Sequence, residues 1–378
     1  MYTKTNWTET TPRSLANLNK METQYDEAIA DAVALRADNT EEIRIFSSAT
    51  FPPSPTEGFL FYHTGFKNVF VYNGTDWIEL KSKAMGYWTE LTPQPVRMAQ
   101  GANLVFTGVD DMYIVQSGNS LVHYKYKIST DTWTLLNNIA IGGTEYRPNF
   151  CDTAYGGGNF IYLLRGNDSI HFLRYSIDTD SWSLLANVPG AVRQGSALVY
   201  TGGDYLYALR GNTTSDFYRY SISGNSWTAM ASLPTTPGGG ARLVYDGGNY
   251  IFATRGGNTT SFYRYSISGN TWASMESSLG TMDEGCSLAC FGTPTIYATR
   301  GNLTTDFYKY LIDENKWIKS IFLPTNFQTG GSITATPIEG KFIFASSYAG
   351  SSIGEKFYYM PLVSAPTLVI SDHEAWMK

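Results

Sequence analysis

A unit of about 45 residues recurs along most of this 378-residue chain, and this repeat restricts the possible folds more than any other feature of the sequence. The segment 205–230 (YLYALRGNTTSDFYRYSISGNSWTAM) recurs closely at 250–275 and more loosely at 111–136, 160–185 and 295–320. Tryptophans mark its period at intervals of 45, 49, 45, 45 and 45 residues: Trp88, Trp133, Trp182, Trp227, Trp272 and Trp317. Repeats of this length are typical of solenoids and propellers.

Each unit contains four short runs in which apolar and polar residues alternate, as expected for β-strands. One unit reads SALVY (196–200), YLYALR (205–210), FYRYSI (217–222) and SWTAM (226–230). The runs are separated by Gly, Asn, Asp or Pro, which favour tight turns. Four strands in about 45 residues are typical of one blade of a β-propeller.

The number of innermost runs predicts six blades. These runs are 102–106, 151–155, 196–200, 241–245, 286–291 and 332–337. The last unit has no tryptophan strand after it, whereas the strand of Trp88 has no blade before it. We therefore predict a mostly β fold in which residues 84–363 form a six-bladed propeller, closed by the strand of Trp88. Closure of this kind removes open sheet edges.

The unit also resembles the Kelch repeat, in which a Gly-Gly doublet, a Tyr and a Trp follow at set intervals. Here Arg210-Gly211 is followed after eight residues by Tyr220 and after six more by Trp227. Three other units keep this spacing: Arg165/Tyr175/Trp182, Arg255/Tyr265/Trp272 and Arg300/Tyr310/Trp317. Arginine replaces the first glycine, so the resemblance implies a divergent Kelch-like propeller and transfers no partner of cellular Kelch proteins.

The amino-terminal segment 1–46 contains a predicted helix from Ser14 to about Arg36, free of Gly and Pro. Apolar residues at alternating spacings of three and four predict a coiled-coil seam that joins copies of the chain into a homo-oligomer, with a trimer as the expected state. The alternative is an amphipathic helix that lies on its own propeller. The seam consists of Leu18, Met21, Tyr25, Ala28, Ala32 and Leu35.

Residues 47–83 combine a proline-rich hinge (51–55) with two alternating runs and a third run at Trp77, which predict a small β-module. This segment resembles short β-modules of bacteriophage tail fibres at Pro52, Pro55, Glu57, Gly58, Tyr62, Tyr72, Gly74 and Trp77. The amino-terminal residues, above all 18–22 (LNKME), resemble the start of phage fibre and baseplate proteins. The resemblance implies a virion protein that attaches to other virion proteins through residues 1–46. The tail 364–378 has no assigned role.

Composition excludes several classes of protein. A net charge of −6 and a pI of about 5.3 give no basic surface for nucleic acid. No apolar run reaches the ~18 residues that insertion into a membrane requires, and the polar first residues do not predict a signal peptide. Three cysteines and four scattered histidines form no metal, cofactor or catalytic motif, so we expect no cofactor and no enzyme. We expect His123 and His171 to face solvent or a blade edge, and Cys286 and Cys290 to be buried and unbridged.

Four arginines end the second strand of successive units: Arg165, Arg210, Arg255 and Arg300. In a propeller they form a partial ring about the axis, where guanidinium groups can clamp a carboxylate or phosphate. A residue repeated in each blade is better explained by structure, because Asp216 and Asp306 follow two of these arginines by six residues and can pair with them.

The loops that enter the innermost strands vary while the scaffold repeats, which is typical of recognition surfaces. Exposed Tyr and Gln beside Arg suit a carbohydrate, since aromatic faces stack on sugar rings and polar groups bind hydroxyls. The candidate ligand-binding residues in these loops are Arg97, Tyr146, Arg147, Arg193, Gln194 and Phe327.

These observations lead to one functional hypothesis and two alternatives. We expect a tail fibre or receptor-binding protein, located in the virion, whose propellers bind a host surface glycan or a teichoic-acid-like polymer. The first alternative is a structural head or capsid fibre without a host ligand. The second is a glycan-cleaving propeller enzyme.

Overall fold

The computed structural model describes 46–48, 60–63, 68–72, 75, 77–80, 88–96, 101–108, 110–211, 213–290, 294–320, 323, 326, 331–335, 341–345 and 355–361. The chain divides into two compact units, one of Met1–Tyr87 with Val363–Lys378 and one of Trp88–Leu362. The predicted helix with its seam, Arg97, Phe327 and the tail 364–378 lie outside the described residues.

The smaller unit contains a short β-sheet. Three strands form the antiparallel meander expected after the hinge, and a first strand, which the sequence did not predict, pairs with β2 in parallel. The strands are β1 (Phe46–Ser48), β2 (Leu60–His63), β3 (Asn68–Tyr72) and β4 (Trp77–Leu80).

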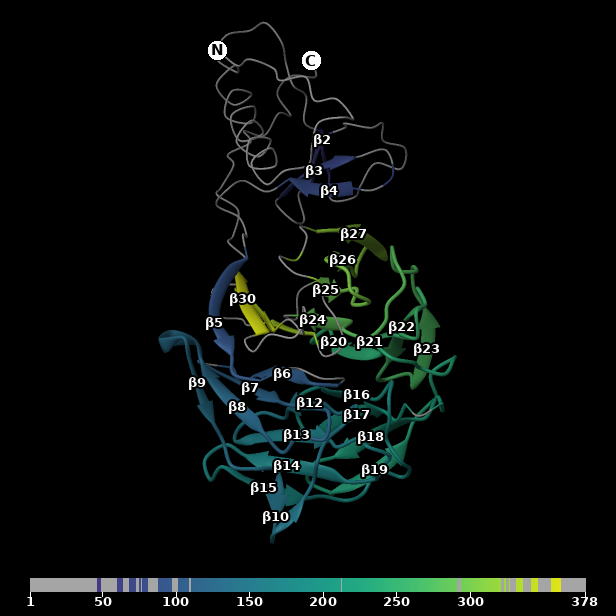
Figure 1. Cartoon of the computed structure of the whole chain (residues 1–378). Coiled ribbons are helices and arrows are strands. Elements are labelled where there is room, and N and C mark those ends of the chain that lie inside the picture. The colour runs from purple at the N-terminus through teal and green to yellow at the C-terminus, as the bar shows by residue number, and fades with distance from the viewer. Residues whose placement is uncertain are drawn as a thin grey trace, which may run out of the picture. The chain divides into compact units, whose positions relative to one another are not determined.

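The larger unit is a β-propeller built from sets of four antiparallel strands (Figure 1). The first three sets are β6 (Asn103–Phe106), β7 (Asp111–Val115), β8 (His123–Lys127) and β9 (Thr132–Leu135); β12 (Asp152–Tyr155), β13 (Phe160–Leu164), β14 (Phe172–Ser176) and β15 (Ser181–Leu184); and β16 (Ala197–Tyr200), β17 (Tyr205–Leu209), β18 (Phe217–Ser221) and β19 (Ser226–Ala229).

The next two sets are β20 (Arg242–Tyr245), β21 (Tyr250–Thr254), β22 (Phe262–Ser266) and β23 (Thr271–Ser274); and β24 (Ser287–Cys290), β25 (Thr295–Thr299), β26 (Phe307–Leu311) and β27 (Lys316–Lys319). The last set joins β28 (Ser332–Ala335), β29 (Lys341–Ala345) and β30 (Glu355–Pro361) to β5 (Thr89–Gln94). A 3-10 turn, η2 (Ile128–Thr130), and a hairpin of β10 (Ala140–Ile141) and β11 (Thr144–Glu145) complete the unit.

The innermost strands close into a ring. Each contacts the next in the order β6, β12, β16, β20, β24 and β28, and β28 contacts β6. β5, which directly follows Trp88, is the outer strand of the last sheet, which confirms the predicted closure between the two ends of the propeller.

The predicted number of blades needs a correction. Five blades are separate four-stranded sheets. The strands β24–β27 keep the antiparallel order of a blade but do not form a separate four-stranded sheet. The described residues therefore show five such blades, and the predicted number of six is wrong.

In four blades the repeated Tyr and Trp connect the blade to the one before it. Tyr220 and Trp227 pair across β18 and β19, and the Tyr220 hydroxyl donates to Asn225 Oδ1 at 2.7 Å. The same oxygen accepts the backbone N–H of Ala186, and Trp227 Nε1 donates to the Ala186 carbonyl at 2.9 Å. These contacts, called the latch below, therefore bind both the N–H and the carbonyl of Ala186 in the preceding blade. The latch recurs at Tyr126/Asp131/Trp133, Tyr265/Asn270/Trp272 and Tyr310/Asn315/Trp317.

A second repeated contact fills the space between blades with an aromatic ring. Phe172, the first residue of β14, lies edge-on to Trp227 of the next blade with ring centroids 4.9 Å apart. Phe217 and Phe262 make the same contact with Trp272 and Trp317. Edge-on pairs of this kind add about 0.5–1.5 kcal/mol beyond area burial.

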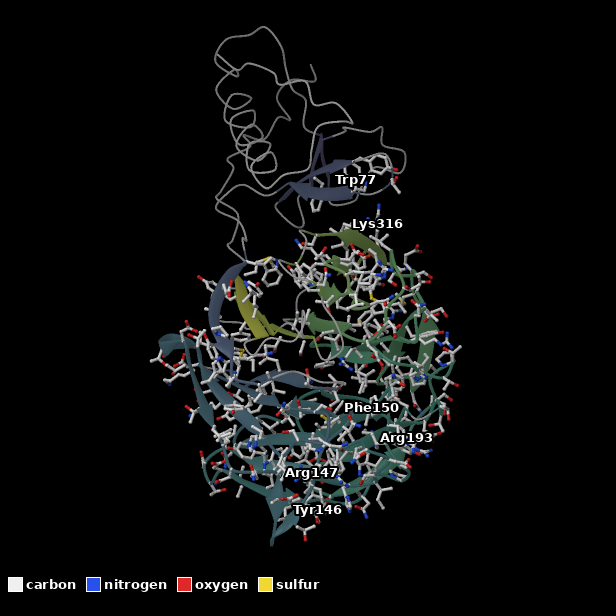
Figure 2. All side chains as sticks on the ribbon, viewed as in Figure 1. Trp77, Tyr146, Arg147, Phe150, Arg193 and Lys316 are labelled. Atoms are coloured by element: carbon white, nitrogen blue, oxygen red, sulfur yellow. The ribbon has the colours of Figure 1, made fainter. Side chains whose placement is uncertain are left out.

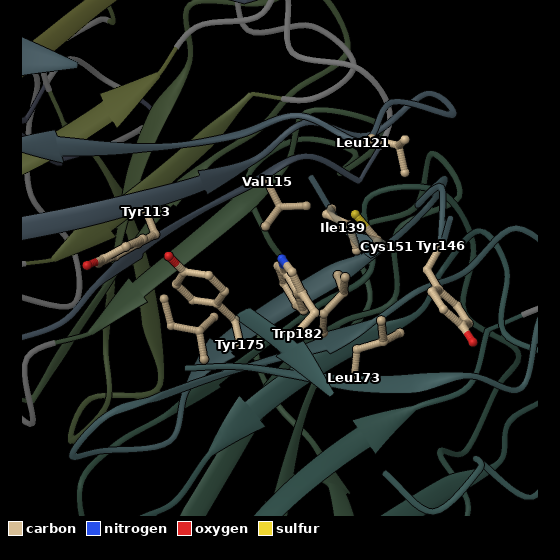
Figure 3. Packing of buried hydrophobic residues seen from close by; sticks show 11 residues of the cluster. Tyr113, Val115, Leu121, Ile139, Tyr146, Cys151, Leu173, Tyr175 and Trp182 are labelled. Carbon is tan, nitrogen blue, oxygen red and sulfur yellow. The ribbon is translucent and has the colours of Figure 1, made fainter. Parts of the chain in front are cut away.

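His123 occupies this slot between the blades β6–β9 and β12–β15, whose packing Figure 3 shows. It lies edge-on to Tyr175 and Trp182 and is only 1% exposed. Of the two predicted positions of His123, solvent or a blade edge, the first is therefore wrong, because Tyr175 and Trp182 of the neighbouring blade cover its ring. Cys151 and Cys286 are buried and none of the three cysteines forms a disulfide, but Cys290 is only half-buried, so its predicted burial is wrong.

Candidate functional site

Two sets of loops meet on one face of the propeller: those after the second strands and those that enter the innermost strands. The backbone bond from Asn149 N to the Arg165 carbonyl joins one loop of each set, as does the bond from Arg193 N to the Arg210 carbonyl. Figure 2 labels Tyr146, Arg147, Phe150 and Arg193 on this part of the larger unit. Most of the predicted ligand-binding residues therefore lie on one loop face.

The arginine ring first of all fastens these loops to the blades. In all four arginines Nε donates to a backbone carbonyl of the loop that enters the innermost strand of the same blade. The carbonyls are those of Arg147 for Arg165 (3.2 Å), Ala191 for Arg210 (2.9 Å), Thr236 for Arg255 (3.1 Å) and Thr281 for Arg300 (3.0 Å). This contact explains why each of these blades needs an arginine at this place.

The outer nitrogens of the guanidinium groups differ from blade to blade. Arg210 Nη1 lies 2.7 Å from Asp216 Oδ2, and Arg300 Nη1 lies 2.9 Å from Asp306 Oδ2, as the spacing in the sequence predicts. Within the described part of the chain, Arg165 and Arg255 have no carboxylate at salt-bridge distance. The position of the aspartate is taken by His171 beside Arg165 and by Ser261 beside Arg255.

Arg165 lies in a cluster that is not repeated among the described residues of the other blades. Its Nη1 is 3.1 Å from Ser169 Oγ and 3.1 Å from His171 Nδ1. Its Cζ lies 5.8 Å from the centroid of the Tyr146 ring, and the His171 ring meets that ring edge-on at 5.2 Å. The structure therefore brings two predicted site residues, Tyr146 and Arg165, together with a histidine that was not among them.

Tyr146 is 9% exposed, so the expectation that it offers an open aromatic face is wrong. It is buried because it follows the hairpin β10–β11 directly, and its ring packs among Leu121, Ile139 and Leu173 (Figure 3). Arg147, the next residue, is exposed and paired with Glu145 at 2.7 Å.

Arg193 and Gln194 form separate contacts closer to the axis. Arg193 pairs with Asp168 at 2.6 Å. Gln194 Nε2 donates to Glu284 Oε1 at 2.6 Å, which links loops 90 residues apart.

A small cavity lies where these loops reach the axis. Its volume is about 30 Å³, which is room for about two water molecules and too small to enclose a sugar ring. The cavity is lined by Gly101, Phe150, Cys151, Gln194, Gly195, Ser196, Gly239, Gly240, Arg242, Glu284 and Gly285.

Polar side chains ring the axis at the start of the innermost strands. Asn103 Nδ2 donates to Asp152 Oδ1 at 2.6 Å, Ser332 Oγ donates to Asn103 Oδ1 at 2.8 Å, and the backbone N–H of Leu198 donates to Asp152 Oδ2 at 2.7 Å. Burial raises the pKa of Asp152, an effect that the Arg242 charge and these hydrogen bonds oppose. Sequence reasoning missed this ring, although Asn103, Asp152 and Arg242 stand at the same position of their strands.

Neither a metal-binding cluster nor a membrane-spanning helix occurs among the described residues. No three His, Cys, Asp or Glu side chains there are close enough to hold a metal ion. No helix among these residues has the length and apolar character needed to cross a membrane.

Comparison with known proteins supports the fold. No model of a known protein family matches the chain, and no curated protein matches it significantly. The chain is similar to a solved structure titled "Structure of YjhT", with 14% identity and a TM-score of 0.56 over 73% of this chain and 98% of that one. It is also similar to a structural genomics protein of unknown function from Bacteroides thetaiotaomicron, with 11% identity and a TM-score of 0.56 over 82% of this chain and 84% of that one. Likeness at these identities shows a shared propeller fold only.

Proposed function

We propose that this chain is a receptor-binding protein of a bacteriophage virion. In this proposal a divergent Kelch-like propeller binds a host surface glycan or a teichoic-acid-like polymer. Residues 1–46 attach the protein to other virion proteins and join its copies into a homotrimer. The virion assignment rests on the resemblance of residues 1–80 to phage fibre proteins.

One observation supports the binding role: residues of the loop face differ between blades, whereas residues that hold the blades together are repeated. The latches and the aromatic slots recur from blade to blade, whereas the hairpin β10–β11 and the cluster of Tyr146, Arg165 and His171 occur once among the described residues. Repeated residues are accounted for by folding. Residues that depart from the repeat on an exposed face are available for recognition.

Binding through several heads provides the mechanism of adsorption. A single shallow site on a loop face binds a sugar weakly, because it buries little surface. Linking several such sites raises the overall affinity by about 10²–10⁴-fold when the geometry allows simultaneous contact.

The test is retention of the purified full-length protein on cell walls of a host strain that the virus infects. We expect retention that free host glycan reduces, and no retention on walls of a strain to which the virus does not adsorb. Absence of retention on host walls would reject receptor binding and favour a structural head or capsid fibre. Release of reducing sugar from the walls would instead support the glycan-cleaving alternative.

A further inference from the structure

Among the described residues, the guanidinium group of Arg165, like that of Arg255, lacks the counter-charge that Arg210 and Arg300 have. Arg210 and Arg300 are neutralised by Asp216 and Asp306. The same place beside Arg165 holds His171, whose backbone carbonyl accepts the Arg165 N–H, as that of Asp216 accepts the Arg210 N–H. The scaffold is therefore the same at both places, and only the charge differs.

The remaining charges around Arg165 do not neutralise it. Arg147 is already paired with Glu145, and Arg193 is paired with Asp168. The amides of Asn119 and Asn167 are exposed and bonded to each other at 3.1 Å. The cluster therefore has a net charge of about +1, which resides on Arg165.

This cation is partly withdrawn from water. Burial lowers the pKa of Arg165. Burial, followed by the Arg165 charge, lowers the pKa of His171 as well, so the imidazole does not add a second charge at neutral pH. A partly buried charge without a partner is costly, and an anion that pairs with it recovers part of that cost.

The surroundings of Arg165 also suit a polymer with hydroxyl groups. Asn119 and Asn167 offer exposed amides, and Arg147 holds the loop through a 3.0 Å bond from Nη1 to the Asn119 carbonyl. The hairpin β10–β11, whose turn residues Gly142 and Gly143 are exposed, lies directly before Tyr146 in the chain. The polar groups, the cation and the hairpin are therefore grouped at one edge of the loop face.

We propose that the cluster of Arg165, His171, Asn119 and Asn167 binds a singly charged anionic group, a phosphodiester or a carboxylate, of a surface polymer. This inference rests on the proposed receptor-binding function and names its binding site and the charge of its ligand. The guanidinium group of Arg165 is the main contact, through Nη2, because Nη1 already lies beside Ser169 Oγ and His171 Nδ1.

The sharpest test is to place an aspartate beside Arg165, at the position that Asp216 and Asp306 occupy beside Arg210 and Arg300. H171D recreates the arrangement of Arg210 with Asp216, so the substitution is compatible with the fold. S261D places the same carboxylate beside Arg255 and serves as the matched control. Full-length wild type and both variants are titrated with poly(glycerol phosphate), polygalacturonate and neutral dextran, and their melting temperatures are compared.

We expect wild type to bind at least one of the two anionic polymers and not dextran. H171D should lose about tenfold or more of that affinity, since charge-assisted hydrogen bonds to the anion are lost. H171D should melt at the same temperature as wild type or higher, and S261D should bind as wild type does. The polymer that binds shows whether a phosphodiester or a carboxylate is preferred.

Three results would overturn the inference: wild type binds neither anionic polymer, H171D binds as wild type does, or S261D loses as much affinity as H171D. Retention on host cell walls separates the two proposals. Retention that H171D does not change would reject this site and leave receptor binding in place. Polymer binding that depends on His171 without retention on host walls would reject receptor binding and leave the anion site in place.

Discussion

Replacement of His123 by phenylalanine should stabilise the protein and remove part of its dependence on pH. His123 occupies the slot between blades that Phe172, Phe217 and Phe262 fill elsewhere. Among the described residues neither ring nitrogen has a hydrogen-bond partner. A phenyl ring keeps the edge-on contacts and buries no polar atom, so H123F should gain about 1–3 kcal/mol at neutral pH.

The pH dependence follows from burial. Burial lowers the pKa of His123 in the fold to about 4, from an ordinary value of 6.5. Because this pKa is lower in the folded than in the unfolded chain, the unfolded chain binds more protons between pH 6.5 and 4, and stability falls as the pH falls through this range. The full difference corresponds to about 3 kcal/mol, since one pKa unit equals ~1.4 kcal/mol.

The assay is denaturant unfolding of wild type and H123F between pH 4.5 and 7.5. Asp152 has the opposite effect on the pH dependence of stability, because its raised pKa makes the fold less stable as the pH rises. This contribution is the same in wild type and H123F, so it cancels when their free energies of unfolding are subtracted. The advantage of H123F should therefore grow as the solution becomes more acidic. A difference that stays constant over this range would refute the reasoning. F217H, at the same position two blades further on, should show the opposite change.

Two further predictions concern the latch and the amino-terminal segment. N270A removes the oxygen that accepts from the Tyr265 hydroxyl at 2.8 Å and from the Ala231 N–H at 2.9 Å, and should cost about 2 kcal/mol or more in denaturant unfolding. N270D should be nearly neutral, because Asp131 has the same two contacts in another blade; a loss as large as that of N270A would contradict the latch. Light scattering should show a trimer for the full-length chain, and a monomer would reject the predicted seam.

Much of the propeller could be predicted from the sequence because its contacts are local and repeated. The four strands of each blade are neighbours in the chain, so alternation and turn residues are sufficient to predict them. The pairing of Arg210 with Asp216 was also accessible, since both residues flank one loop. The closure of the last sheet by β5 followed from counting strands, although its partners are more than 250 residues apart.

The candidate site could be predicted only in part. The spacing placed the four arginines after the second strands of their blades, but the repeat did not reveal that each Nε binds the loop entering the innermost strand of the same blade. Tyr146 was expected to be open and is buried, because residues of two blades surround it. The bond between Gln194 and Glu284 joins loops separated by another blade, which no local pattern indicates.

The sequence by itself determined the repeating unit, the strands within it and the residue types that hold neighbouring blades together. These properties depend on interactions within one unit, and every copy of the unit repeats the information. Only the tertiary structure decided the environment of the residues that depart from the repeat: His123 is buried, Asp152 lies in a polar ring, and Arg165 lacks a carboxylate. Closure of the ring brings distant units into contact, and burial and charge at those contacts depend on residues that no single unit contains.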